Sequence, residues 1–518
     1  MLNRWAEEEP DRPLVNFGAT TLTYGQTQTQ ARALAAALYN LGIQEGDKVA
    51  IDLPNWPEFV VSSLAAANLG ATIVPLNPAY SPHELQFMLR NSEASVAIAA
   101  ERFEGADNLE LFERMQADLP DLQYLVTVGE EDLWYDDRIF QFEDLISSGE
   151  GKPLPTQAID PEEGVYALLY TAGTTGKPKA VMLTHSNLVR TNAATAQALG
   201  MSREDVVLVA VPMFNIFGLG TLVAALSAGA SVVLMDKFDA DESLAKISEC
   251  GVTVLNGVPT MFVMQLRSPM LDEVDLSSLR TGIVAGAPVS NELAREARER
   301  MVPDLEIAYG LTETSATVSI TRAGSSEEKR SFTVGSPLDG VEIAVLGDDG
   351  AKLPVESVGE LAVRGFNVMK GYYRQPDETR RAFTEDGFFR TGDLAMLDEE
   401  GYVHVVGRKK DTIVRGGYSI YPREVEDVLR LHPAVQDVVV VGVENEVLGE
   451  LICACILPVE GAIVTGDEIK EFCSGQVAQY KVPDLIRFVD SFPMTGSGKV
   501  RRVELARMIS AERSAHRT

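Results

Sequence analysis

The hydrophobic positions in the first half of the chain fall into short runs, separated by longer stretches of helical spacing. Residues 47–53, 94–100 and 122–129 are rich in Val, Ile, Leu and Ala, which is typical of buried strands. Residues 28–42 and 62–70 carry Ala and Leu at helical spacing. Strands that alternate with helices predict parallel sheets covered by helices, so we expect an α/β fold in this part of the chain.

One apolar run raises the question of a membrane span. Residues 206–235 contain no charge, and their length exceeds the ~20 residues that a spanning helix needs. Pro212, Asn215, Gly218 and Gly220 interrupt the run. We interpret it as a strand, a turn, a helix of small residues and a second strand, all buried inside the protein, and we predict no transmembrane segment.

The pattern changes after about residue 335, where short strands and tight turns such as Asp348-Asp-Gly350 predict a small β-rich subdomain. From residue 409 the α/β pattern returns over about 110 residues, enough for an independent lid. We therefore predict two domains. Residues 1–408 form a large N-terminal domain of parallel sheets with the β-rich subdomain, and residues 409–518 form a small, mobile α+β lid.

Composition narrows the class of protein. The 518 residues are 45% hydrophobic and 23% charged, which fits a globular chain. A net charge of −31 argues against a nucleic-acid partner. The N-terminus has no apolar run after its early arginine, so we expect a cytoplasmic protein. The cysteines have no CxxC spacing and are interpreted as reduced core residues without zinc or disulfides: Cys250, Cys453, Cys455 and Cys473.

The strongest candidate for chemistry is the segment 170–179, YTAGTTGKPK, which follows a strand-like run. Its glycines let backbone amides approach a phosphate, its threonines donate hydrogen bonds, and its lysines supply charge. Pro178 stands where a Walker A loop needs Ser or Thr, so this is a different polyphosphate loop. Taken alone, it could be an ordinary surface turn. The candidate phosphate contacts are Thr171, Ala172, Gly173, Thr174, Thr175, Gly176, Lys177 and Lys179.

Four further motifs follow in order: YGLTET at 309–314, RTGD at 390–393, GRKKD at 407–411 and PMTGSGK at 493–499. Together with the threonine-rich loop, they resemble the adenylate-forming superfamily of acyl-CoA synthetases, nonribosomal peptide adenylation domains and beetle luciferases. The resemblance covers nearly the whole chain, from residues 22–24 to 499–501. It implies an AMP-forming acid–thiol ligase that uses ATP, Mg²⁺ and coenzyme A.

The resemblance assigns nucleotide-binding roles to several positions. It makes Tyr309 a neighbour of adenine, Thr312 a phosphate donor and Glu313 a magnesium ligand together with Thr171, a set of hard oxygen donors that suits this metal. A core tyrosine and a solvated glutamate are the structural alternative. Further nucleotide contacts implied by the family are Gly286, Ala287, Pro288 and Gly310.

Other implied roles concern the ribose and the lid. Asp393, in a tight Thr-Gly-Asp turn, can accept both ribose hydroxyls, although an aspartate in such a turn often bonds only its own backbone. Arg408 is implied as a second ribose or phosphate contact, and Lys410 as the hinge of the lid. As a bare charge run, residues 408–410 would be a solvated face. Gly417 would let the pantetheine arm of CoA pass close to the backbone.

The implied catalytic residues are Lys499, Thr312 and Glu313. Lys499 lies in a glycine-rich segment that could deliver a cation to the α-phosphate when the lid closes, or could be a mobile tail lysine. In the implied reaction a carboxylate attacks the α-phosphate and releases pyrophosphate. The lid then rotates, and the CoA thiol attacks the acyl-adenylate and releases AMP.

The substrate is expected to be a carboxylic acid other than an amino acid. Amino-acid-activating relatives place Asp after the phenylalanine of a Pro-x-Phe segment, whereas Asn215 follows Phe214 here, where many acyl- and aryl-CoA synthetases have His. Ala172 and Ala180 depart from the usual Ser and Gly, from which we expect altered ATP affinity without loss of activity. The acyl pocket should be lined by Phe214, Asn215, Phe217, Val258, Ala285, Gly286, Gly310 and Thr314.

The residues at 77–85 and 309–320 are most similar to those of bacterial medium- and long-chain fatty acyl-CoA synthetases. This similarity favours a fatty acid as the substrate. An aryl- or short-chain-acid CoA ligase, an acyl-AMP ligase that loads a carrier protein, and a non-catalytic adenylate binder stay open as alternatives. The expected partners are a small carboxylic acid, ATP and CoA, and a homodimer is also left open.

Overall fold

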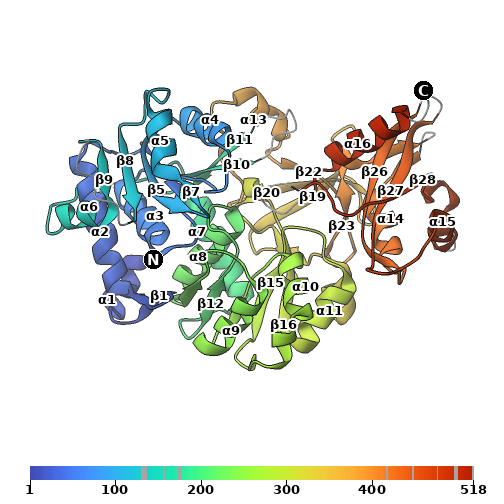
Figure 1. Ribbon diagram of the computed structural model, residues 1–518, viewed down its shortest axis with the longest axis horizontal. Coiled ribbons are helices and arrows are strands. Elements are labelled where there is room, and N and C mark those ends of the chain that lie inside the picture. The colour runs from blue at the N-terminus through green and yellow to red at the C-terminus, as the bar shows by residue number, and fades with distance from the viewer. Residues whose placement is uncertain are drawn as a thin grey trace. The chain divides into compact units, whose positions relative to one another are not determined.

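A computed structural model describes residues 1–129, 137–155, 158–171, 178–415, 418–445, 448–474, 476–494 and 500–515 (Figure 1). Its contacts divide the chain into two compact units, and the chain enters the second unit twice. Unit 1 contains residues 1–342 and 363–389, and unit 2 contains residues 343–362 and 390–518.

Unit 1 is built on two large sheets, and the parallel pairing expected from the sequence is confirmed in both. In the described residues the first sheet has the strand order β18-β17-β16-β15-β14-β12-β13-β1-β2, parallel from β16 to β1. Its strands are β1 (Pro13–Phe17), β2 (Thr20–Thr23), β12 (Val206–Val209), β13 (Ser231–Leu234), β14 (Val254–Leu255), β15 (Thr281–Val284), β16 (Asp304–Tyr309), β17 (Ser319–Ile320) and β18 (Ser336–Pro337).

The second sheet has the order β21-β11-β10-β4-β3-β5-β8-β9 and is parallel from β10 to β9. The pairs β10–β11 and β11–β21 are antiparallel. Its strands are β3 (Lys48–Asp52), β4 (Thr72–Pro75), β5 (Ala94–Ala100), β8 (Tyr124–Val128), β9 (Ile139–Gln141), β10 (Val165–Thr171), β11 (Lys179–Thr184) and β21 (Gly371–Tyr372). A short pair is formed by β6 (Arg102–Phe103) and β7 (Ala106–Asp107).

Helices connect these strands, and several begin at capping boxes that are visible in the sequence. The side chain of Thr23 accepts from the backbone of Gln26, and Ser81 does the same for Glu84, which fixes the first turns of α2 and α4. The helices are α1 (Leu2–Glu8), α2 (Tyr24–Asn40), α3 (Pro57–Leu69), α4 (Pro82–Ser92), α5 (Asn108–Gln116), α6 (Phe142–Gly149), α7 (His185–Ala198), α8 (Ile216–Ala228), α9 (Ala240–Cys250), α10 (Pro259–Arg267), α11 (Asn291–Arg300), α12 (Glu327–Phe332) and α13 (Pro376–Ala382), with short 3₁₀ turns η1 (Pro269–Asp272) and η2 (Thr312–Thr314).

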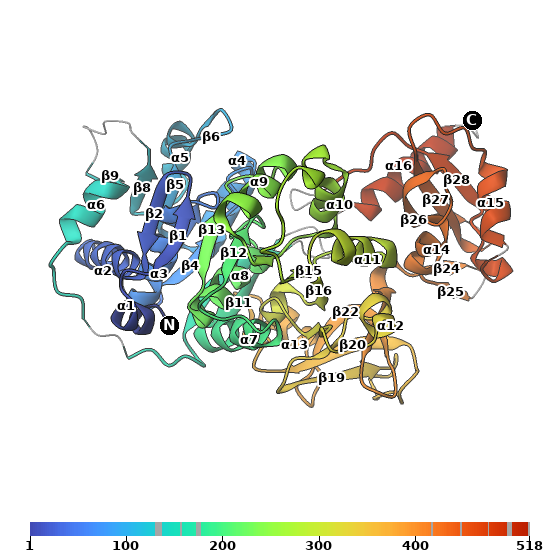
Figure 2. The same cartoon turned by 90° about the horizontal axis from the view of Figure 1, so that it is seen from below.

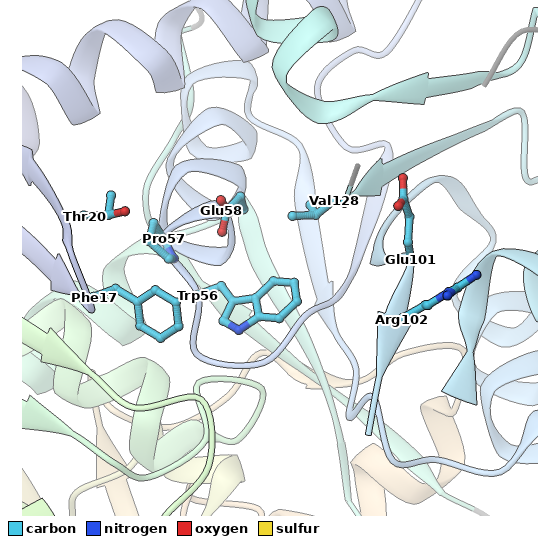
Figure 3. Close-up of a pocket in the computed structure, with 9 residues that line it drawn as sticks. Phe17, Thr20, Trp56, Pro57, Glu58, Glu101, Arg102 and Val128 are labelled. Atoms are coloured by element: carbon cyan, nitrogen blue, oxygen red, sulfur yellow. The ribbon is translucent and has the colours of Figure 1, made fainter. Parts of the chain in front are cut away.

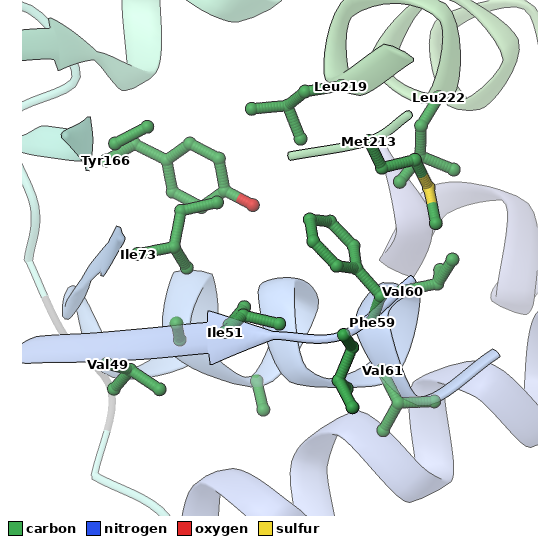
Figure 4. Packing of buried hydrophobic residues seen from close by; sticks show 14 of the residues in the cluster. Val49, Ile51, Phe59, Val60, Val61, Ile73, Tyr166, Met213, Leu219 and Leu222 are labelled. Carbon is green, nitrogen blue, oxygen red and sulfur yellow. The ribbon is translucent and has the colours of Figure 1, made fainter. Parts of the chain in front are cut away.

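The uncharged run at 206–235 is β12, α8 and β13, as expected, and it belongs to the core. Leu219 and Leu222 of α8 pack with Phe59 of α3 and Ile51 of β3 in one apolar cluster (Figure 4). Burying one such side chain is worth about 1.5–3 kcal/mol, which favours this interior position. In the described part of the chain no helix has the length and apolar character needed to cross a bilayer.

Unit 2 contains most of the predicted β-rich subdomain and the C-terminal α+β part, where helices pack on a mainly antiparallel sheet (Figure 2). The first sheet of the unit has the order β19 (Val341–Leu346), β20 (Gly359–Gly365), β22 (Phe389–Leu397), β23 (Val403–Arg408). The C-terminal part comprises η3 (Lys409–Asp411), β24 (Ile413–Arg415), β25 (Tyr418–Ile420), α14 (Pro422–Leu429), β26 (Val435–Asn445), β27 (Gly449–Pro458), α15 (Gly466–Ser474), η4 (Gln479–Lys481), β28 (Leu485–Phe488) and α16 (Arg502–Ala515).

One expectation about the core was wrong. Cys453, Cys455 and Cys473 are buried free thiols, but Cys250 is exposed. Cys250 is the last residue of α9, where the amphipathic helix ends and Gly251 takes a left-handed conformation. The predicted boundary at residue 408 and the hinge at Lys410 stay predictions, and the compact unit that holds residues 409–518 also contains residues 343–362 and 390–408.

Candidate active site

The predicted phosphate loop connects the two antiparallel strands β10 and β11 in unit 1. β10 ends at Thr171 and β11 begins at Lys179, and these two residues face each other in the strand register. The Thr171 hydroxyl donates to the carbonyl oxygen of Lys179 at 3.5 Å. The two ends of the loop are therefore fixed by a buried strand pair. Six of its predicted phosphate contacts lie outside the described residues: Ala172, Gly173, Thr174, Thr175, Gly176 and Lys177.

Lys179 contacts two residues that the sequence analysis did not identify. Its Nζ lies 2.5 Å from Oε2 of Glu378 and 4.9 Å from the centroid of the Tyr372 ring. The hydrogen bond from Lys179, together with its charge, lowers the pKa of Glu378, which keeps the carboxylate ionised. Glu378 stands in the first turn of α13, 199 residues away from Lys179, and no local pattern connects the two.

The YGLTET sequence at 309–314, called the Tyr309 motif here, forms a tight turn at the end of β16. A Cβ on Gly310 would lie 1.6 Å from the carbonyl oxygen of Ala316, so only glycine fits there without a shift of the backbone. Ser315 and Ala316 have φ angles of 56° and 93°, which places two non-glycine residues at positive φ directly after η2. Strained backbone of this kind is frequent at functional sites.

Glu313 projects from this turn and is held by β21 and the residues before it. Its Oε1 accepts a hydrogen bond of 2.9 Å from the Tyr372 hydroxyl, and its carbonyl oxygen accepts one of 2.8 Å from the backbone of Met369. The same short segment bonds β11, because the backbone N–H groups of Lys370 and Tyr373 donate to the carbonyl oxygens of Met182 and Ala180. The segment therefore holds the turn of Glu313 beside the strand that closes the phosphate loop.

The chemistry of the two predicted metal ligands fits the magnesium ion that the motifs imply. Glu313 offers carboxylate oxygens and Thr171 a hydroxyl, and both are hard donors that Mg²⁺ prefers. Among the described residues no group of three or more His, Cys, Asp or Glu could hold a metal ion. Binding of Mg²⁺ through one or two carboxylates, with nucleotide phosphates and water as further ligands, is usual for this metal.

The predicted acyl-pocket residues come from four loops of unit 1. Phe214, Asn215 and Phe217 are half-buried at the start of α8, and the Asn215 side chain does not cap the helix. Further along α8, a Cβ on Gly220 would lie 3.3 Å from Cβ of Ala316, so this helix packs against the Tyr309 turn.

The second part of the predicted pocket lies after β15. Gly286 has a φ of 88°, and a Cβ there would lie 3.3 Å from Cγ1 of Val258. Ala287 and Pro288 follow Gly286 and are exposed. Thr314 differs from the other predicted lining residues, because it is fully buried and its hydroxyl bonds both backbone groups of Leu311. Its contribution is to the shape of the turn.

The two predicted ribose contacts lie together in unit 2. Asp393 in β22 faces Arg408 in β23, and Nε of Arg408 lies 3.0 Å from Oδ1 of the buried aspartate. The expectation of a tight turn at Asp393 was wrong. Asp393 is inside a nine-residue strand, and Gly392 alone takes a positive φ of 72°. Pairing with β23 keeps this segment extended.

The run 408–410 is only partly a solvated face. Lys409 lies 3.1 Å from Asp348 and 3.5 Å from Glu360, so it is paired within the unit, as is Arg408. Lys410 is exposed and forms no ion pair with any described residue. Gly417 and Lys499 lie outside the described residues, and their roles stay predictions.

Comparisons with known proteins agree with the order of the motifs. Residues 2–373 match the family model of the AMP-binding enzymes, and residues 424–499 match that of the AMP-binding enzyme C-terminal domain. The Bacillus subtilis (strain 168) protein YngI, an inferred acyl-CoA synthetase, is 38% identical over 530 residues, covering 98% of this chain and 95% of YngI. A long-chain-fatty-acid–CoA ligase of the same organism is 34% identical over 518 residues, covering 96% of this chain and 91% of that protein.

The fold has a solved counterpart with a reaction intermediate. The o-succinylbenzoate CoA synthetase MenE of Bacillus subtilis, in complex with its acyl-adenylate, superposes with a TM-score of 0.83 at 30% identity, covering 97% of each chain. The chain therefore belongs to the AMP-binding enzyme family, as an AMP-forming acid–CoA ligase.

Proposed function

We propose that the protein activates a medium- or long-chain fatty acid with ATP and Mg²⁺ and transfers the acyl group to CoA. The observation that carries the adenylation half of this proposal is the Tyr372 side chain, which contacts both Lys179 of the phosphate loop and Glu313 of the Tyr309 motif. Tyr372 therefore holds both the cation proposed to bind phosphate, Lys179, and the carboxylate proposed to bind the metal ion, Glu313. This is the pair of charges that binding of a metal–nucleotide complex requires.

In the proposed first step, the phosphate loop and Lys179 bind the polyphosphate, and Glu313 would hold the Mg²⁺ ion. Bound Mg²⁺ neutralises negative charge on the phosphates. A carboxylate oxygen of the acid attacks the α-phosphorus, and the bond from phosphorus to the pyrophosphate oxygen breaks. Lys499 stabilises the charge that develops there, and Asp393 and Arg408 orient the ribose.

In the proposed second step, the thiol of CoA releases its proton to water and attacks the acyl carbon of the adenylate. The carbon–oxygen bond to AMP breaks, which gives the thioester and free AMP. Gly417 would provide room for the pantetheine arm, and Lys410 the hinge for the movement between the two steps.

Asn215 supports an acid without an ammonium group. Its carboxamide does not cap α8 and is half-buried next to Phe214 and Phe217, so it is available to donate to a substrate carboxylate. It carries no charge that could pair with an amino group. The long-chain fatty acid named for the Bacillus subtilis relative supports an alkyl chain as the rest of the substrate.

An aryl acid is the main alternative, because MenE is named for an aromatic acid, o-succinylbenzoate, and has the same fold. A hydroxamate screen over straight-chain acids from acetate to stearate and a set of aromatic acids tests the proposal. We expect the highest kcat/KM for a chain of medium or long length. A preference for aromatic acids would contradict the fatty-acid assignment, and transfer to a carrier protein but not to CoA would contradict the acceptor.

We also propose a cytoplasmic location. All four cysteines are free thiols, which supports a reducing compartment. Recovery of the activity in the membrane-free fraction of lysed cells is the expected outcome, and recovery outside intact cells would contradict it.

A further inference from the structure

A cavity of about 580 Å³ lies in unit 1, and none of the residues predicted for the acyl or nucleotide sites lines it (Figure 3). Its walls come from Phe17 at the end of β1, Trp56 and Glu58 after β3, and Glu101 and Arg102 after β5. Its volume is within the range of small-molecule sites.

The topology of the second sheet marks this place as a ligand position. After β3 the chain runs through α3 to β4 on one side, and after β5 it runs through α5 to β8 on the other side. β3 and β5 are neighbours, so the connections leave their carboxyl ends in opposite directions. Ligands of open parallel sheets bind in the crevice at such a switch point.

The cavity is remote from the Tyr309 motif along the first sheet. Phe17 ends β1 and Tyr309 ends β16, and four strands, β13, β12, β14 and β15, lie between β1 and β16. At a strand spacing of ~4.8 Å the two strands are roughly 24 Å apart. A ligand seated at Phe17 is therefore well separated from the Tyr309 turn, whereas along the second sheet β10, which ends at Thr171, is separated from β3 by the single strand β4.

The charge of the cavity is unbalanced. Apart from its own backbone amide, the Glu58 carboxylate has no partner among the described residues, and burial, with a smaller contribution from Glu143, raises its pKa. Glu101 accepts a hydrogen bond of 2.5 Å from Gln141. Arg102, the cation in the lining, is mostly exposed and lies 3.9 Å from Asp107. A partly buried carboxylate without a counter-charge is unfavourable, and a cationic ligand would remove that cost.

The other walls suit the body of such a ligand. The rings of Phe17 and Trp56 are half-buried and lie on the same side of the cavity as Glu58 (Figure 3). Indole and phenyl faces attract ammonium groups and also pack against apolar groups. The long alkyl tail of a fatty acid would pack against the two rings but would leave the carboxylate of Glu58 unpaired.

We propose that this cavity is a second ligand site, specific for an organic cation in which an ammonium group is attached to an aromatic or aliphatic body. Glu58 pairs with the ammonium group, and Trp56 and Phe17 pack against the body. The site lies beyond the proposed function and does not depend on the identity of the acid.

Calorimetric titration of the full chain with 2-phenylethylamine and with 2-phenylethanol tests the proposal, because the two probes share a ring and differ in charge. We expect the amine to bind at least about tenfold more tightly than the alcohol, as a desolvated ion pair with an aromatic contact would give. Glu58→Gln keeps the shape of the side chain and should lower the affinity for the amine to the affinity for the alcohol. Glu249→Gln, on an exposed position of α9, makes the same charge change elsewhere and should have no effect.

Equal affinity of the two probes, binding of neither, or an amine preference that survives Glu58→Gln would overturn the proposal. Pyrophosphate exchange should be unchanged in both variants, which shows that they are folded. If Glu58→Gln did not fold, the comparison of the two probes on the unmodified protein would still decide the matter. If Trp56→Phe weakened binding of a fatty acid and left binding of the amine unchanged, the cavity would belong to the acyl chain and the proposal would fail.

Discussion

The hydroxyl of Tyr372 donates a 2.9 Å hydrogen bond to Oε1 of Glu313. Burial, with the nearby charge of Glu313, raises the pKa of Tyr372, so the hydroxyl stays protonated and can only act as a donor to the carboxylate. The ring of the same tyrosine lies below Nζ of Lys179. One side chain thus positions a candidate metal ligand and a candidate phosphate ligand that are far apart in sequence.

Tyr372→Phe should weaken binding of Mg-ATP. The substitution removes one hydrogen bond to a charged group, worth about 1.5–3 kcal/mol, and leaves the ring below Lys179. We expect the KM for Mg-ATP in pyrophosphate exchange to rise about tenfold or more, with a smaller change in kcat and a higher Mg²⁺ requirement. The neighbouring Tyr373→Phe is the matched control, because that hydroxyl bonds Glu93 at 3.2 Å and not Glu313. Equal effects of both variants would contradict a positioning role for Tyr372.

Gly310→Ala should abolish adenylation by displacing the Tyr309 turn. The added Cβ would meet the carbonyl oxygen of Ala316 at 1.6 Å, so the backbone must move. We expect at least a hundredfold loss in kcat/KM, equivalent to about 2.7 kcal/mol, and a lower midpoint of thermal unfolding. Gly324→Ala is the control, since a Cβ there meets no atom within 4 Å, and it should retain activity and stability.

Lys499→Ala should separate the two half-reactions. If Lys499 stabilises charge on the α-phosphate, its loss costs about 3–4 kcal/mol, or 10²–10³ in the rate of adenylate formation. Transfer from a chemically prepared acyl-adenylate to CoA should remain within a few-fold of the unmodified rate, as measured by thioester formation. Similar losses in both steps would be inconsistent with a lysine that leaves the site when the lid rotates.

Asp52→Asn should stabilise the protein at alkaline pH. Asp52 is buried at the end of β3, its Oδ1 has no hydrogen-bond partner in the described part of the chain, and burial raises its pKa from 3.8 to about 7. Between these values the folded state keeps a proton that the unfolded state has released. The stability of the protein therefore falls as the pH rises from about 4 to about 7 and stays lower above that range.

The expected gain for Asp52→Asn above pH ~7 is on the order of 4 kcal/mol, and it should disappear toward pH ~4, where both side chains are neutral in the folded state. Thermal unfolding followed over this pH range measures the difference. Asp121→Asn, at an exposed position, makes the same substitution on the surface and should show no such dependence. Destabilisation by Asp52→Asn at all pH values would contradict this prediction.

Local patterns of residues were sufficient to predict many of the helices and strands and to locate the motifs. The runs at 47–53 and 94–100 are strands β3 and β5 because alternating or continuous apolar residues favour burial whatever they pack against. The uncharged run at 206–235 was correctly interpreted as buried, although Gly218 and Gly220 lie within α8, and the helix ends at Ala228 before Gly229. Asp393 was misjudged, because a Thr-Gly-Asp sequence favours a turn, whereas pairing of β22 with β20 and β23 places it in a strand.

The sequence by itself determined the family and the parallel sheets covered by helices, since both depend on side-chain chemistry or on spacing within a few residues, and it predicted which residues hold phosphate, metal and ribose. Only the tertiary structure decided that Tyr372 and Glu378 support those residues, that Thr314 is buried, and that Glu58 faces a cavity without a counter-charge. These relationships arise when chain segments far apart in sequence fold against one another, and no local pattern of residues records which side chain will be brought to which.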